Sequence, residues 1–175
     1  PPVSLSPGPR LSVMREKVKQ AALVVSWRIP GLPSQEVYPL DVAAEVAGGG
    51  RTSRLYRVVK EEKGLVDGVG VDCYTPAGLG LFEVDAKLSP GQTEQAWPEL
   101  IAQTLSLAVQ PPSEAELNRA RVNAQAEQVR SRQTMQGQAD LLGYFELLRG
   151  GYEKAAEYLD RFKAVTAPEV AAVAR

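Results

Sequence analysis

The residue types that could carry chemistry are few in this chain, and the most informative observation is one that is missing. None of the 175 residues is a histidine, and Cys73 is the single cysteine. Hydrolytic zinc sites take two or three imidazoles, and the alternatives need several cysteines. Nucleophilic sites that pair serine or cysteine with histidine need an imidazole too. The sequence therefore predicts no catalytic residue and no metal ligand in this chain.

Carboxylates and the cysteine remain as candidates. Glu61–Glu62, and Glu114 with Glu116, fall in stretches of helical spacing, so we interpret both pairs as solvated helix surfaces rather than general acid–base pairs. Cys73 lies in a strand-like run and has no cysteine to pair with in the chain. We interpret it as a small buried side chain, with a reactive thiol as the alternative.

Three consecutive glycines, Gly48 to Gly50, could suggest a phosphate-binding loop. Neither the Gly-Lys-Ser/Thr tail of a P-loop nor the pattern of a dinucleotide site follows them. They come directly after residues 35–47, whose apolar positions recur at helical spacing, with Pro39 tolerable only in the first turn. We interpret the glycines as the end of that helix, at a close approach between two chain segments.

The segment that follows the glycines predicts a short helix and then a β-hairpin. Thr52 or Ser53 can cap the start of the helix, and Gly64 can end it in a left-handed turn. Its apolar face would consist of Leu55, Val58 and Val59. Residues 69–74 and 79–86 alternate with period two and are separated by turn-forming residues, which predicts two antiparallel strands.

A strand is also predicted before these elements, over residues 18–29. Its run from Ala21 to Val25 is continuously apolar, as in a central strand, so we expect it inside the sheet. The run is far too short to cross a bilayer. Proline and serine dominate residues 1–9, which we interpret as a linker or lead-in to a single domain over residues 10–175.

The second half of the chain is predicted to be largely helical. The expected helices cover residues 97–109, with Pro98 as the first helical residue; 113–132, opened by a Ser113/Glu116 capping box; a segment between a break at 133–134 and Gly150–Gly151; 153–165; and a last helix capped at Thr166. The expected inward residues include Trp97 in the first, and Ala156, Leu159, Phe162 and Ala164 in the fourth. This order of elements predicts an α+β domain, an antiparallel sheet with helices packed on one face.

The order from the glycine triplet through Ser53-Arg54-Leu55-Tyr56 and Glu62-Lys63-Gly64-Leu65 to the hairpin resembles the M16 insulinase and processing-peptidase family of zinc metallopeptidases. The resemblance covers the whole chain. Catalytic units of that family carry a His-x-x-Glu-His motif, which this sequence lacks. The resemblance therefore implies a non-catalytic, C-terminal-type unit, with the last strand of the family's fold missing after Arg175.

The resemblance also implies partners and a substrate. The non-catalytic unit of the family closes the peptide-binding chamber over a zinc-bearing partner domain, in the same chain or in another subunit. It often offers an arginine and a tyrosine seven residues apart to hold the peptide. Alignment on Gly64-Leu65 puts those substrate-binding roles at Lys60 and Asp67, a departure because aspartate cannot donate a hydrogen bond when ionised. Arg54 and Tyr56 are expected to fix the short helix against its neighbours.

Other interpretations stay open. A catalytically silent scaffold subunit of the same fold is the first alternative, and a helical adaptor unrelated to peptidases is the second, although it leaves the sheet unexplained. The sheet edge could also line the chamber for extended peptides. A homodimer remains open, as does a bacterial cytoplasmic or periplasmic location. The net charge of −1, with scattered lysines and arginines, predicts neither a nucleic-acid nor a membrane partner.

Overall fold

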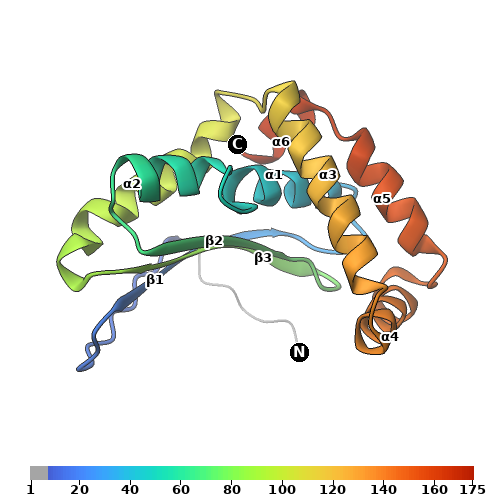
Figure 1. Ribbon diagram of the computed structural model, residues 1–175, viewed down its shortest axis with the longest axis horizontal. Coiled ribbons are helices and arrows are strands. Elements are labelled where there is room, and N and C mark those ends of the chain that lie inside the picture. Colours follow the sequence, from blue (N-terminus) through green and yellow to red (C-terminus); the bar gives the residue numbers. More distant parts are fainter. Residues whose placement is uncertain (1–7) are drawn as a thin grey trace.

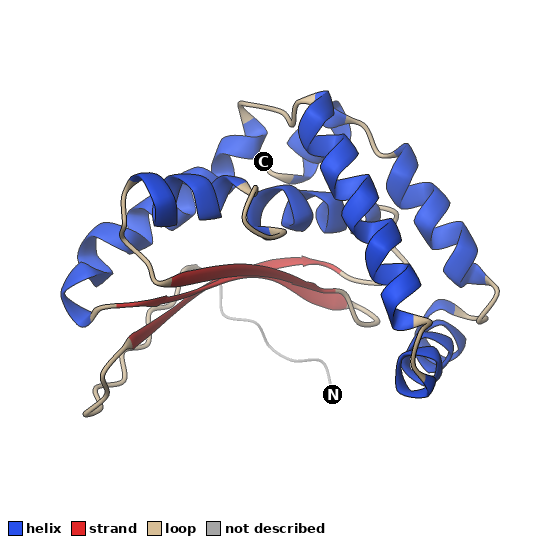
Figure 2. Ribbon diagram, in the orientation of Figure 1, coloured by secondary structure: helices blue, strands red, loops and turns tan. Residues whose placement is uncertain are grey.

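The computed structural model describes residues 8–175 as an antiparallel sheet with helices on one side of it (Figure 1). Figure 2 shows that no helix within residues 8–175 lies on the opposite face of the sheet. This arrangement confirms the predicted α+β fold class. The elements are β1 (Ala21–Pro30), α1 (Val37–Gly48), η1 (Tyr56–Glu62), β2 (Gly68–Tyr74), β3 (Leu79–Leu88), η2 (Pro90–Gln92), α2 (Thr93–Leu105), η3 (Ser106–Ala108), α3 (Glu114–Ser131), α4 (Met135–Tyr144), η4 (Phe145–Arg149), α5 (Lys154–Ala164) and α6 (Ala167–Val173).

The three described strands lie in the order β1-β3-β2, with both pairs antiparallel. The prediction that the first strand lies inside the sheet is therefore wrong, because β3 is central and β1 is at an edge. The apolar run misled because side chains alternate between the two faces of a strand. Leu23 and Val25 are half-buried under the helices, whereas Ala22 and Val24 are exposed on the open face.

The core lies between the sheet and α1. The helix begins at Val37, so Pro39 falls in its first turn, as predicted, where the missing N–H has no intrahelical partner to lose. Every second residue of β3 points at the helices and is fully buried, and the apolar face of α1 packs over them. The central members of this core are Val42, Val46, Val84, Ala86, Leu88 and Leu100.

The α2 helix differs from its prediction. It begins at Thr93 rather than at Pro98, which is its sixth residue, and its inward face consists of Ala96, Leu100 and Thr104. Trp97, predicted to point inward, is 49% exposed. Proline in this position removes one intrahelical hydrogen bond, and packing of the buried face compensates for that loss. The prediction used proline as a start signal and therefore shifted the inward face.

The later helices begin and end at their predicted signals. Ser113 and Glu116 form the predicted capping box of α3, Thr134 caps α4 after the predicted break, and Gly150 ends η4 at φ 77°. Thr166 with Glu169 forms a capping box for α6. The inward face of α5 is only partly as predicted: Phe162 is buried and Leu159 half-buried, but Ala156 and Ala164 are exposed and Ala155 is buried in their place.

The predicted lead-in lies mostly outside the described residues, since the structure describes it only from Gly8 onward. Gly8 and Pro9 are exposed and have no regular secondary structure. In the described part of the chain, every helix is too short or too polar to span a bilayer.

Candidate functional site

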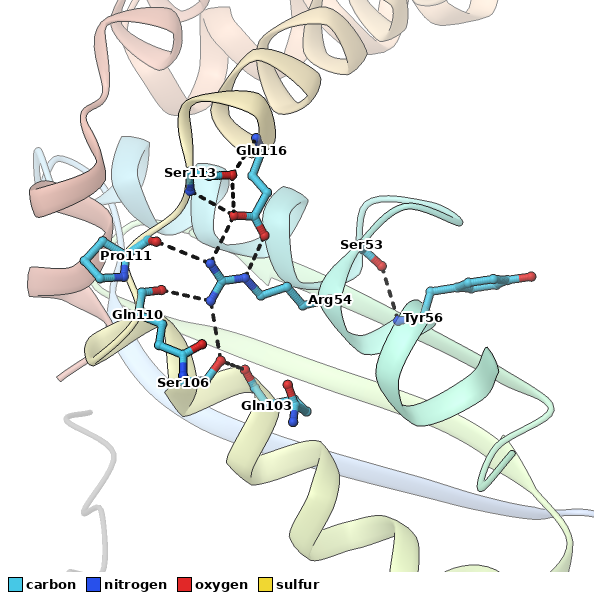
Figure 3. Close-up of polar contacts among 9 residues, drawn as sticks. All are labelled: Ser53, Arg54, Tyr56, Gln103, Ser106, Gln110, Pro111, Ser113 and Glu116. Atoms are coloured by element: carbon cyan, nitrogen blue, oxygen red, sulfur yellow. Dashed lines mark hydrogen bonds and ion pairs between the residues drawn. The ribbon is translucent and has the colours of Figure 1, made fainter. Parts of the chain in front are cut away.

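The short helix after the glycine triplet is fixed by Arg54, as predicted. The Nε and Nη2 atoms of Arg54 donate to the two carboxylate oxygens of Glu116, at 2.8 and 3.1 Å (Figure 3). The Nη1 atom of Arg54 donates to the backbone oxygen of Gln110 at 2.9 Å. A fork of this kind matches a planar guanidinium to a carboxylate. The contacts join the start of this helix to the loop before α3. Tyr56 points away from them in Figure 3, so the predicted anchoring role applies to Arg54 alone.

Glu116 is therefore not the solvated helix residue that its sequence context predicts. Its side chain is 15% exposed, and it also accepts hydrogen bonds from the backbone N–H and the hydroxyl of Ser113, at 2.8 and 2.9 Å. The hydrogen bond from Arg54, followed by those from Ser113, lowers the pKa of Glu116 to about 2 against the cost of burial. Glu116 is held ionised as a structural group, whereas Glu114 is 70% exposed, as predicted.

The helix is a π-helix from Tyr56 to Glu62, and it positions the two predicted substrate-binding residues. π-Helical segments are rare and occur often at functional sites. Ser53, one of the two predicted caps, accepts a hydrogen bond from the backbone N–H of Tyr56 at 3.4 Å. Gly64 follows the helix with φ 60°, which is the predicted left-handed end. The chain then turns into β2, and this turn returns Asp67 toward the helix.

Lys60 and Asp67 lie next to each other at the end of η1. The Lys60 ammonium donates to the backbone oxygen of Asp67 at 2.6 Å and lies 4.8 Å from the centre of the Tyr56 ring. The Asp67 carboxylate is exposed and accepts a hydrogen bond from the Gln20 side chain at 2.9 Å. The pair offers a half-buried cation beside an exposed anion. Such a pair can hold a polar group.

The open face of the sheet is the second surface with a recognition capacity. Its side chains form cross-strand rows, because Val24 lies opposite Asp85, Ser26 opposite Glu83, and Arg28 opposite Leu81. Tyr74 extends the last row, and Val24, Tyr74 and Leu81 are all exposed. The outer edge of β1 has no neighbouring strand among the described residues. The surface is therefore mixed apolar and polar beside an unpaired strand edge.

Cys73 is half-buried and belongs to a site that the sequence did not reveal. Burial, and the nearby Asp41 carboxylate, raise the pKa of its thiol far above the ordinary value, so it is a poor nucleophile at neutral pH. The interpretation as an inert side chain is favoured over a reactive thiol. Asp41 itself lies in α1 between Leu40 and Val42, both buried. An acidic residue directly between two buried apolar residues was the available signal.

Metal ligation does not fit the donor set of this chain. There are no imidazoles and one thiol in the sequence, and no three metal-binding side chains come together within residues 8–175. A hydrolytic zinc ion needs at least three protein ligands of the right type. The carboxylates that are buried, Asp41 and Glu116, are already hydrogen-bonded to tyrosine, arginine and serine.

Fold and site together define an α+β domain with a basic residue on its short π-helix and one sheet face that no helix of residues 8–175 covers. Residues 1–123 match the family model of the peptidase M16 inactive domain, and the chain belongs to that family. This confirms the resemblance that the glycine triplet, the short helix and the hairpin carry.

Comparison with individual proteins agrees with this assignment. An uncharacterized zinc protease of Mycobacterium leprae is 26% identical over 167 residues, which are 95% of this chain and 38% of that protein. The fold matches a protease from Helicobacter pylori with a TM-score of 0.80 at 18% identity, over 91% of this chain and 38% of the other. It also matches an inactive peptidase domain from Bordetella parapertussis, with a TM-score of 0.77 at 22% identity, over 92% of this chain and 87% of the other. The chain thus spans under half of the M. leprae relative.

Proposed function

We propose that this domain is the non-catalytic half of an M16-type zinc peptidase and that it closes the peptide-binding chamber over a zinc-bearing partner domain. Zinc and the hydrolytic residues would belong to the partner. Membership of the inactive-domain family is the observation that carries the proposal. Two further facts support it: the chain contains no histidine, and it spans only 38% of a relative called a zinc protease. Peptide hydrolysis by the assembled protein then requires both halves.

The open sheet face and the β1 edge support a chamber-lining role. An unpaired strand edge offers backbone N–H and C=O groups to an extended peptide, whatever its sequence. The cross-strand rows beside that edge would contact alternate side chains of such a peptide. Because the helices cover only one face, the other face is accessible to substrate (Figure 2).

Lys60 is the residue of this domain that we propose contacts the peptide. Its ammonium has three donors, and the bond to the Asp67 backbone oxygen uses one of them. That bond and the Tyr56 ring hold the side chain in place, so two donors remain for a substrate carbonyl. Asp67 would then act mainly through its backbone, which positions Lys60.

The proposal is tested by measuring cleavage of a quenched fluorescent peptide by this chain, by a zinc-bearing half, and by their mixture. We expect cleavage by the mixture, its loss on chelation of zinc, and no cleavage by this chain alone. Chelator-resistant cleavage by this chain alone would contradict the proposal. Full activity of the zinc-bearing half alone would contradict it as well.

A catalytically silent scaffold of the same fold is the alternative, and one observation favours it. Both predicted substrate-binding residues already have partners in this chain: Lys60 bonds to Asp67, and Asp67 bonds to Gln20. The variant Lys60→Met distinguishes the two functions in the assembled peptidase. The chamber role predicts a fall in kcat/KM of about tenfold, worth about 1.4 kcal/mol of transition-state stabilisation. The scaffold role predicts no change. Lys154→Met, on the exposed start of α5, is the matched control.

A further inference from the structure

A cavity of about 730 Å³ lies between α1, the end of β2, and the helices α3, α4 and α5. A volume of this size is within the range of small-molecule sites, roughly 300–1,000 Å³. The cavity is lined by Val71, Asp72 and Cys73 toward the end of β2, whereas Lys60 and Asp67 lie before its start. Asp67 and Cys73 are six residues apart, about 20 Å along a strand that rises about 3.3 Å per residue. It is therefore separate from the proposed substrate contact.

A half-buried carboxylate, that of Asp41, lines this cavity. The Tyr158 hydroxyl donates to Asp41 Oδ2 at 2.6 Å, and the Cys73 thiol lies beside the same carboxylate. Burial raises the pKa of Asp41 despite these hydrogen bonds. None of the ion pairs found among residues 8–175 includes Asp41. The nearest cation, Arg149, acts on it through space and is held 4.9 Å from the centre of the Tyr158 ring, with its Nη2 donating to the Tyr144 hydroxyl.

The charge around the cavity is negative, and its wall is apolar. Glu45 lies on the lining together with Glu127, which is neutralised by an ion pair with Arg130 at 2.7 Å. Asp72 also contributes to the lining, but its side chain belongs to the open face of the sheet, in the row of Glu83 and Ser26. The wall opposite Asp41 comes from helices α4, η4 and α5. Its main apolar side chains are Leu141, Phe145, Leu159 and Phe162.

We propose that this cavity binds an organic cation, a protonated amine carried on an apolar chain or ring, with its ammonium directed at Asp41. An anion would meet Asp41 and Glu45, neither of which is in an ion pair found within residues 8–175. A neutral apolar molecule would desolvate Asp41 further and leave it without a bonded cation, because Arg149 acts on it only through space. An amine provides that partner, while its apolar body covers the aromatic wall.

The proposal is tested by calorimetric titration of this chain with 2-phenylethylamine, and with 2-phenylethanol and phenylacetate as neutral and anionic analogues of the same size. We expect the amine to bind at least tenfold more tightly than the alcohol, and phenylacetate not to bind. An acetylated lysine-containing tripeptide separates the two sources of the cation, because a free amine and a lysine side chain present the same group. Equal binding of amine and alcohol would overturn the proposal.

Variants locate the binding within the cavity. Asp41→Asn keeps the shape of the side chain and is expected to weaken amine binding at least tenfold, whereas Asp160→Asn, an exposed residue of α5 outside the cavity lining, should leave it unchanged. Ala124→Leu narrows the cavity without altering any charge and should weaken binding even if Asp41→Asn does not fold. Unchanged affinity in both Ala124→Leu and folded Asp41→Asn would show that the amine binds elsewhere.

Discussion

Arg54 determines where the short π-helix lies. Its guanidinium contacts the Glu116 carboxylate and backbone oxygens of the loop before α3, groups more than 50 positions away in sequence. The sequence predicts that Arg54 fixes the helix, because it stands at the helix start next to an apolar face. It does not predict the partner, since Glu116 already has a complete local explanation in its capping box. Besides capping α3 with Ser113, Glu116 therefore also binds the distant Arg54 side chain.

The depressed pKa of Glu116 predicts how stability depends on pH. Because the folded pKa, about 2, lies below the ordinary glutamate value of 4.5, ionised Glu116 stabilises the folded state above pH 4.5, and this contribution is lost as the pH falls toward 2. We expect Glu116→Gln to lower the free energy of unfolding at pH 7 by about 2 kcal/mol, after allowing for partial solvent exposure. The loss should shrink below pH 3.

Urea denaturation at pH 7, 4 and 2.5 measures this dependence. Glu114→Gln is the matched control, because Glu114 lies on the same helix turn and is 70% exposed. We expect the control to change the free energy of unfolding by under about 0.5 kcal/mol at each pH. A loss in Glu116→Gln that is the same at all three pH values would show that Arg54 contributes through packing rather than through charge.

The glycine triplet acts at the scale of whole elements, because it lets α1 end directly against β2. A Cβ added at Gly48 would lie 2.7 Å from the backbone nitrogen of Val71, closer than real side chains come. The predicted close approach of two chain segments is therefore confirmed. Gly50 serves a different purpose, since it has φ 82° and open space around it.

Substitution of the two glycines by alanine separates these two purposes. We expect Gly48→Ala to lower the free energy of unfolding by about 2–3 kcal/mol, because either α1 or β2 must shift. Gly50→Ala should cost about 1 kcal/mol, from the left-handed backbone alone. Thermal unfolding of both variants measures the difference. A smaller loss for Gly48→Ala than for Gly50→Ala would mean that α1 and β2 do not approach as closely as described.

The start and stop signals of the helices after residue 112 were predictable from the sequence, whereas the start of α2, the place of β1 in the sheet and some helix faces were not. The capping pairs at Ser113 and Thr166 act through residues three positions apart, so local sequence contains all the information. The place of β1 at the sheet edge follows from the pairing of β3 with both β1 and β2, which puts β3 in the centre. A continuous apolar run in β1 carries no information about that pairing. Trp97 was misplaced for a related reason, because Pro98 was taken as the helix start.

At the scale of the whole molecule, the structure is unequally packed. The sheet, α1 and α2 share the main core, whereas α4 contains no buried residue and Leu147 of η4 is 82% exposed. The cavity lies between α1 and the continuous helical segment formed by α4 and η4, residues 135–149. The sequence could not reveal that cavity, because the hydrogen-bonded pair Asp41 and Tyr158 is 117 positions apart and meets only after the helices have packed.

Hydrogen exchange should therefore divide the chain into two regions. Local opening requires little loss of buried apolar surface in α4 and η4, and much more in β3 and α1. We expect amides of residues 135–149 to exchange at least a hundredfold faster than those of the buried β3 core around Val84, as measured by mass spectrometry on peptic fragments at pH 7. The fully packed α1 segment around Val42 is the internal reference. Equal protection of residues 135–149 and β3 would mean that the α4–η4 segment unfolds only with the whole domain.

Addition of 2-phenylethylamine gives a second, independent measurement. A ligand bound between α1 and the α4–η4 segment should slow exchange in residues 135–149 and leave exchange in η1 unchanged.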